Sequence, residues 1–214
     1  MTSFARSERA ALADLMLRLG PDAPTLCTGW RTRELAAHLV IRERRPDAAA
    51  GVLLAPFAGY TDRVLKQTAA GDYRALVDRV AEPPWWSPLS NPLVHEVTNL
   101  LEFFVHHEDV LRAQPGWRAD APDAVRDLPR GESEALWSRV AFAGARLRRL
   151  PVRTTLVAPG FGERGPMGDG PPVRVIGAPG ELALFCLGRQ RAAVVEVDGE
   201  SAAGELLLGA RLGI

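Results

Sequence analysis

The sequence contains almost no lysine: Lys66 is the single lysine, and all the other residues among its 26 basic side chains are arginine. It also carries no net charge, because 26 acidic residues balance the 26 basic ones. A neutral chain has no overall field that would attract nucleic acid or an anionic membrane surface, so we expect neither as a partner. The arginine-, alanine-, glycine- and proline-rich composition suggests a GC-rich bacterial genome rather than a function.

Cysteine and long apolar runs are scarce as well. Cys27 and Cys186 lie far apart, in regions that we assign to different domains, so the sequence predicts a reducing compartment and no disulfide framework. No apolar run approaches the roughly 20 residues of a membrane span. The apolar segment at residues 4–19 is interrupted by five charged residues and does not resemble a signal peptide. We therefore expect a cytoplasmic protein without a membrane partner.

The first 150 residues show a helical pattern. Apolar residues recur at helical spacing in four long segments, at residues 3–19, 33–45, 96–112 and 133–150. Two shorter segments, at residues 61–68 and 72–80, show the same spacing. Connections rich in proline and glycine separate these segments, and no strand pattern intervenes. One connection, at residues 82–92, carries Trp85 and Trp86 and is interpreted either as a lid over the helix ends or as a pocket wall. The pattern predicts a helical bundle over residues 1–150.

The pattern changes after residue 150. Strands are predicted at residues 154–157, 173–176 and 194–197, and short helices at 181–188 and 205–211. The glycine-rich segment 160–172 predicts a hairpin or loop rather than a phosphate cradle, because no Lys-Ser/Thr pair follows it. The chain is thus predicted to be α+β, with a small mixed α/β domain at residues 151–214 after the bundle.

All four histidines lie in the predicted helical region: His38, His95, His106 and His107. Glu102 and His106 are four residues apart, so they share one helix face and can reach one metal ion. An ordinary polar surface explains this spacing equally well, and both interpretations stay open on that helix alone. If residues 33–45 face residues 96–112, His38 completes a three-ligand set with open coordination positions, as in catalytic metal sites.

Three side chains near these candidate ligands are not assigned as metal ligands themselves. His107 is turned by about 100° from His106 around the helix, so both cannot bind one ion, and we assign His107 to packing or to the surroundings of the site. Asp109 is either an ordinary surface carboxylate or the partner that orients a ligand imidazole. His95 is too far along the helix for easy coordination and is placed at the pocket wall.

Two segments carry a family resemblance. Residues 27–39, CTGWRTRELAAHL, resemble the CxGWxxxxxxAHL segment of the DinB-like four-helix proteins, in the branch named after mycothiol-dependent maleylpyruvate isomerase. Residues 102–110, EFFVHHEDV, are similar to the ExxVHHxD segment of that branch. The tail at residues 173–189 is similar to the small sterol-carrier-like domain that often follows. The resemblance implies a DinB-like four-helix bundle followed by a sterol-carrier-like α/β domain.

The resemblance also implies His38, Glu102 and His106 as ligands of a divalent metal ion, most often zinc, and mycothiol as the thiol partner. We therefore expect a thiol-dependent transferase or isomerase that acts on a small electrophile; no catalytic residue and no particular substrate is assigned. Two alternatives stay open. One is a non-enzymatic, metal-loaded bundle that binds a small ligand or a protein partner, and the other is a bundle without metal whose histidines are satisfied by hydrogen bonds. A homodimer through an exposed apolar face is compatible with each.

Overall fold

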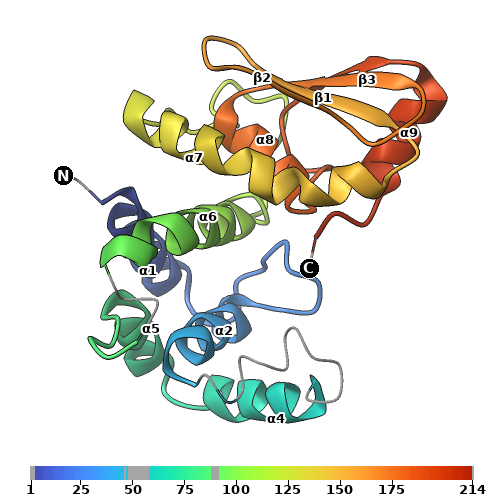
Figure 1. Cartoon of the computed structure of the whole chain (residues 1–214). Coiled ribbons are helices and arrows are strands. Elements are labelled where there is room, and N and C mark those ends of the chain that lie inside the picture. Colours follow the sequence, from blue (N-terminus) through green and yellow to red (C-terminus); the bar gives the residue numbers. More distant parts are fainter. Residues whose placement is uncertain (1–2, 46, 48–57, 88–91, 214) are drawn as a thin grey trace. The chain divides into compact units, whose positions relative to one another are not determined.

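The computed structural model describes residues 3–45, 47, 58–87 and 92–213, and for residues 58 and 92–98 it describes the backbone alone. The chain divides into two compact units, Met1–Gly116 and Trp117–Ile214 (Figure 1). The first unit is helical and the second combines helices with a four-stranded sheet, so the predicted α+β class is confirmed. The proposed domain boundary at residue 150 differs from this division, because the last long helix of the bundle prediction groups with the sheet.

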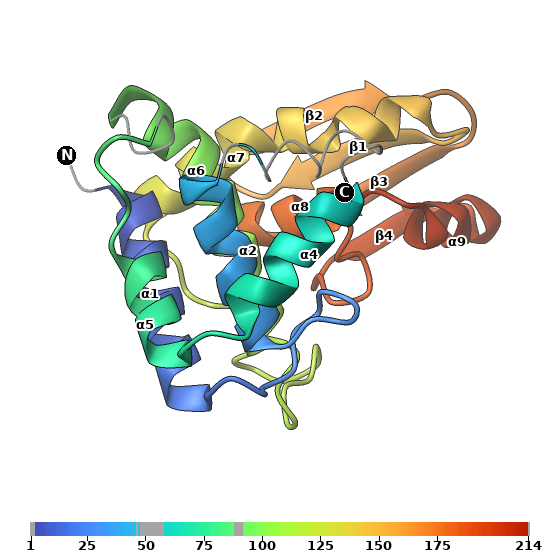
Figure 2. The same cartoon turned by 90° about the horizontal axis from the view of Figure 1, so that it is seen from below.

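The first unit is built from helices in the predicted order: α1 (Phe4–Leu19), α2 (Thr32–Arg44), α4 (Ala58–Ala69), α5 (Tyr73–Ala81) and α6 (Pro92–Leu111). Helix α1 packs against α5 and α6, and α2 packs against α4 and α5. Figure 2 shows α5 lying along α1. Within the described residues, no helix has both the length and the apolarity that crossing a membrane requires.

Local signals fix the helix ends. The Ser3 side chain caps α1 by accepting a hydrogen bond from the backbone N–H of Arg6 at 3.3 Å, and Asp72 caps α5 in the same way through Ala75 at 2.7 Å. Helix α1 ends at Gly20, whose φ of 82° is a conformation that side chains disfavour. These residues set where α1 and α5 begin and where α1 gives way to the loop toward α2.

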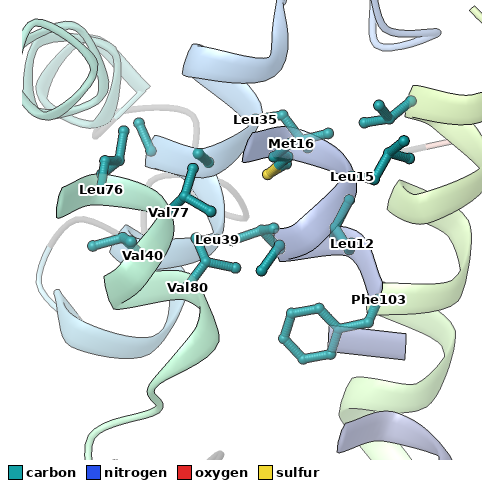
Figure 3. Packing of buried hydrophobic residues seen from close by; sticks show 14 of the residues in the cluster. Leu12, Leu15, Met16, Leu35, Leu39, Val40, Leu76, Val77, Val80 and Phe103 are labelled. Atoms are coloured by element: carbon teal, nitrogen blue, oxygen red, sulfur yellow. The ribbon is translucent and has the colours of Figure 1, made fainter. Parts of the chain in front are cut away.

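An apolar core joins all five of these helices (Figure 3). It gathers fully or almost fully buried side chains, chiefly from α1, α2, α5 and α6 and with Ala69 from α4, among them Leu12, Leu15, Met16, Leu35, Leu39, Val40, Leu76, Val77, Val80 and Phe103. Burying one such leucine, valine or phenylalanine contributes about 1.5–3 kcal/mol. The core therefore gives α2 and α6 a rigid base for the polar side chains on their other faces.

A buried arginine connects the same helices through polar contacts. Arg9 of α1 forms an ion pair with Glu43 of α2, and both side chains are 3% exposed. Its Nη1 atom also donates to the backbone oxygen of Val80 at 2.7 Å, and its guanidinium lies 4.1 Å from the ring centre of Phe103. A charge so deeply buried is tolerated only when it is paired and hydrogen-bonded.

The second unit begins with α7 (Arg130–Ala143), which continues as the 3-10 helix η4 (Gly144–Arg149). Strands β1 (Arg153–Ala158), β2 (Gly162–Met167), β3 (Pro172–Ile176) and β4 (Glu196–Gly199) form a sheet in the order β2-β1-β3-β4. Strands β1 and β3 are parallel, and the other pairs are antiparallel. Helix α8 (Pro179–Cys186) is buried along its whole length and packs on α7, and α9 (Ser201–Gly209) packs on β3 and β4.

Several elements differ in extent from the sequence prediction. Strand β2 forms an antiparallel hairpin with β1, in agreement with the hairpin alternative for this segment; its sequence GERGPM is poor in strand-forming residues, and pairing with β1, for example Arg164 with Leu156, makes it a strand. The predicted helix 133–150 leaves α-helical geometry at Gly144, which has low helix propensity. Strand β4 lies two residues later than predicted, because Val197 pairs with Val175 of β3.

Candidate metal centre

The side chains of His38, Glu102 and His106 converge in the first unit. His38 comes from α2, and the other two lie one turn apart on α6, as their spacing of four predicts. The Nε2 atom of His38 lies 3.1 Å from Oε1 of Glu102, and Nε2 of His106 lies 3.4 Å from the same oxygen. Three possible ligand atoms, one from each residue, all lie within 4.8 Å of one another. The structure thus brings together the three residues that the sequence singled out.

The cluster is partly open to solvent. Side-chain exposure is 19% for His38, 25% for Glu102 and 11% for His106. The two imidazoles meet edge to face with ring centres 5.4 Å apart, and the ring centre of Trp30 lies 5.1 Å from that of His38. His38 therefore contacts two other aromatic rings, and part of its side chain stays exposed to solvent.

The second nitrogen of His106 is bound on the opposite side of the ring. Its Nδ1 atom lies 2.9 Å from Oδ2 of Asp109, a carboxylate with no exposed side-chain surface. The thiol of Cys27 donates to the same oxygen at 3.2 Å, and the backbone N–H of Leu26 donates to the backbone oxygen of Asp109 at 3.0 Å. The loop between α1 and α2 is thereby attached to α6 behind the ring. With Nδ1 hydrogen-bonded to Asp109, Nε2 is the ring nitrogen that faces Glu102.

An arginine approaches Glu102 from α2. The Nε atom of Arg42 lies 3.5 Å from Oε1 of Glu102, and its Nη1 donates to Oδ1 of the buried Asn99 at 2.7 Å. Arg42 follows His38 by one helical turn, so both reach α6 from the same face of α2. This arrangement fixes the carboxylate between a guanidinium and two imidazoles.

The electrostatics of the metal-free cluster follow from these contacts. Desolvation by burial would raise the pKa of Glu102, but hydrogen bonds from His106 and His38 and the charge of Arg42 hold it well below its usual range. Desolvation likewise would lower the pKa of His106, but hydrogen bonds with Asp109, Cys27 and Glu102 raise it well above its ordinary value. A proton on His106 Nε2 thus occupies the position between the imidazole and the carboxylate.

The donor set suits a divalent ion. Two imidazole nitrogens and one carboxylate oxygen are common ligands of zinc, and three protein ligands leave coordination positions for another molecule. A carboxylate on the far nitrogen of a ligand imidazole, as Asp109 provides, is the usual support for such a ligand. Cys27, His106 and Asp109 form a second close group, but it uses the Nδ1 atom that is already hydrogen-bonded to Asp109. The first group therefore fits an ion better.

The other sequence candidates have different surroundings. His107 is buried and its Nδ1 lies 2.9 Å from Oε2 of Glu8 on α1, so it joins two helices and points away from the cluster. The backbone of His95 belongs to α6, and its side chain lies outside the described residues. Trp85 is 91% exposed and Trp86 49% exposed, so neither indole forms the packed lid that was one interpretation of this loop.

Sequence reasoning missed two members of the site. Arg42 was not singled out, although its position one turn after His38 was a usable signal. Cys27 was considered for disulfide pairing and as part of a motif segment, whereas its thiol also donates to the Asp109 carboxylate behind His106. That contact joins residues 82 positions apart, and nothing in the local sequence indicates it.

Comparison with sequence families gives no match, and comparison with curated proteins gives none. Among solved structures, the chain is similar to a structure described as the crystal structure of the mycothiol-dependent maleylpyruvate isomerase, with a TM-score of 0.57 and 16% sequence identity. The similarity covers 95% of this chain and 97% of the isomerase. At this identity the comparison establishes a shared fold, and it agrees with the fold family indicated by the two sequence segments.

Proposed function

We propose that this protein binds a divalent metal ion, with zinc as the favoured ion, through His38, Glu102 and His106. The observation that carries the proposal is the convergence of two imidazole Nε2 atoms on one carboxylate oxygen, at 3.1 and 3.4 Å. Hydrogen bonds alone also satisfy three such groups, but the Asp109 contact gives His106 the tautomer that a metal ligand needs.

We further propose that the metal-loaded protein is a thiol-dependent transferase or isomerase acting on a small electrophile. The shared fold supports this step, because the similar structure is described as a mycothiol-dependent isomerase. Mycothiol is accordingly the first thiol to test. We also propose that the fold is a DinB-like four-helix bundle followed by a sterol-carrier-like domain. A cytoplasmic location is also proposed, in keeping with Cys27 and Cys186, which are thiols rather than halves of a disulfide.

Each residue of the site has a distinct task in this function. His38 and His106 supply neutral nitrogen ligands, and Glu102 supplies one negative charge. Asp109 keeps the proton of His106 on Nδ1. Arg42 holds the carboxylate of Glu102 in place and offsets part of its charge. When bound, a divalent ion would supply the Lewis acidity that favours the thiolate form of a coordinated thiol.

The first experiment measures metal content. The full-length protein is purified without a chelator and without a histidine tag, and its metals are quantified by elemental analysis. We expect about one divalent ion per chain, and metal-free preparations that do not take up zinc, cobalt or manganese would refute the proposed centre. Calorimetry with mycothiol then compares metal-loaded and metal-free protein, and binding should require the metal.

Catalysis is tested separately. Metal-loaded protein with mycothiol is assayed against a panel of small electrophiles, with Glu102→Gln as the control for background reaction. Acceleration that disappears in the control supports an enzyme. Metal and thiol binding without acceleration of any reaction would instead favour the non-enzymatic alternative, a metal-loaded protein that binds a small ligand or a protein partner. The exposed indole of Trp85 is the observation that favours this alternative.

A further inference from the structure

A groove in the second unit lies outside the candidate metal centre. It has a volume of about 560 Å³ and is lined by Ala141, Arg148, Glu163, Arg164, Gly165, Pro166, Met167 and Gly168. These residues come from α7, from η4 and from β2 and the turn that follows it. The volume is within the range of about 300–1,000 Å³ that is usual for small-molecule sites.

The charge of the groove is positive. Glu163 is neutralised by Arg174, whose Nη2 lies 2.7 Å from its carboxylate. Among the residues that the structure describes, no carboxylate lies within ion-pair distance of Arg148 or Arg164, which leaves two guanidinium groups without an acidic partner. Guanidinium groups bind carboxylates and phosphates through several parallel hydrogen bonds.

Arg164 is held in place by its neighbours. Its Nε atom donates to the backbone oxygen of Trp137 at 3.1 Å, and its guanidinium lies 4.8 Å from the centre of the Trp137 ring. Arg148 stands exposed on η4. A fixed arginine loses little side-chain entropy when it binds an anion, because its conformation is already restricted. Ala141, Pro166 and Met167 add apolar surface beside the two charges.

We propose that this groove binds a small organic anion, a carboxylate or a phosphate monoester with an apolar substituent. The two arginines contact the anionic group, and Ala141, Pro166 and Met167 contact the substituent. The proposal is independent of the metal centre, because every lining residue belongs to the second unit.

The test uses nuclear magnetic resonance on the full-length, nitrogen-15-labelled protein after chelator treatment, so that no bound metal competes for the anion. Phenyl phosphate and phenylacetate are titrated in parallel, with phenol as the neutral control probe. We expect saturable shifts of the Gly165, Met167 and Gly168 amides with at least one anion, and none with phenol. Saturation by phenyl phosphate alone identifies a phosphate site, and saturation by phenylacetate alone identifies a carboxylate site.

Two variants and one control complete the test. Arg148→Gln and Arg164→Gln should each weaken binding by about tenfold or more, as expected for loss of a charged hydrogen bond. Arg191→Gln, at an exposed arginine that does not line the groove, should leave the affinity unchanged. Arg148 is exposed, so its variant remains informative if Arg164→Gln misfolds. Shifts that do not saturate, or saturable binding that Arg148→Gln leaves intact, would overturn the proposal.

Discussion

The Nδ1 atom of His106 lies 2.9 Å from Oδ2 of Asp109, one turn further along α6. This contact orients the ring, with Nδ1 toward Asp109 and Nε2 toward Glu102. It also joins the candidate metal centre to the loop after α1, since the backbone of Asp109 accepts a hydrogen bond from Leu26.

Asp109→Asn should weaken metal binding by about 10–100-fold, the usual cost of removing the support of a ligand imidazole. The amide retains the shape of the carboxylate but loses its charge, so His106 becomes a weaker ligand. Competition with a metal-sensing dye measures the affinity. An unchanged affinity in a folded variant would show that Asp109 does not act through His106.

The two adjacent histidines provide a matched pair. His106→Asn retains a donor near the Nδ1 position and removes Nε2, so metal binding should be lost while the Asp109 contact survives. His107→Asn retains a donor toward Glu8 and should bind metal like the unmodified protein, because His107 points to α1. Elemental analysis of both purified variants makes the comparison. Equal metal content in the two would place the ion elsewhere.

Metal affinity should rise with pH. The pKa of His106 is raised in the metal-free protein, and its Nε2 proton must leave before that nitrogen can bind an ion. Affinity should therefore increase by up to about tenfold per pH unit until the pH exceeds that raised pKa. Dye competition between pH 6 and 9 gives the profile. A profile already flat at pH 6 would contradict the involvement of His106.

The pKa shifts of His106 and Glu102 also make the stability of the metal-free protein depend on pH, in opposite directions. The raised pKa of His106 contributes stability that is present below its unfolded-state value and is lost as the pH rises through the folded-state value. The lowered pKa of Glu102 contributes stability that is present above its unfolded-state value and is lost as the pH falls through the folded-state value. Urea denaturation in the presence of a chelator should show both losses, and His106→Asn should remove the loss at high pH.

The buried ion pair offers a prediction about folding alone. Glu43→Gln leaves the charge of Arg9 buried without its partner and should destabilise the protein by about 3–5 kcal/mol. Asp62→Asn, which breaks the exposed pair with Lys66, is the control and should change stability by less than about 1 kcal/mol. Urea denaturation compares the two variants. Equal losses would mean that burial does not govern the strength of these pairs.

The helical periodicity and the two motif segments predicted the part of the site that lies within single helices. Glu102 and His106 share a face because four residues make about one turn, and the structure places His38 opposite them. Contacts between distant residues were not predictable in this way. The Cys27–Asp109 contact depends on how a loop crosses α6, and strand β2 exists because β1 pairs with it rather than because of its own sequence. Side-chain geometry around His95 remains a prediction.

The burial of helix α8 predicts how the second unit unfolds. Every residue from Pro179 to Cys186 is buried, so solvent reaches the amides of this helix only when the surrounding sheet and α7 come apart. Their hydrogen exchange should therefore be among the slowest in the chain and should follow global unfolding of that unit rather than local fraying. Exchange at α8, recorded beside exchange at α6 with and without metal, would reveal whether the two units unfold as one or separately.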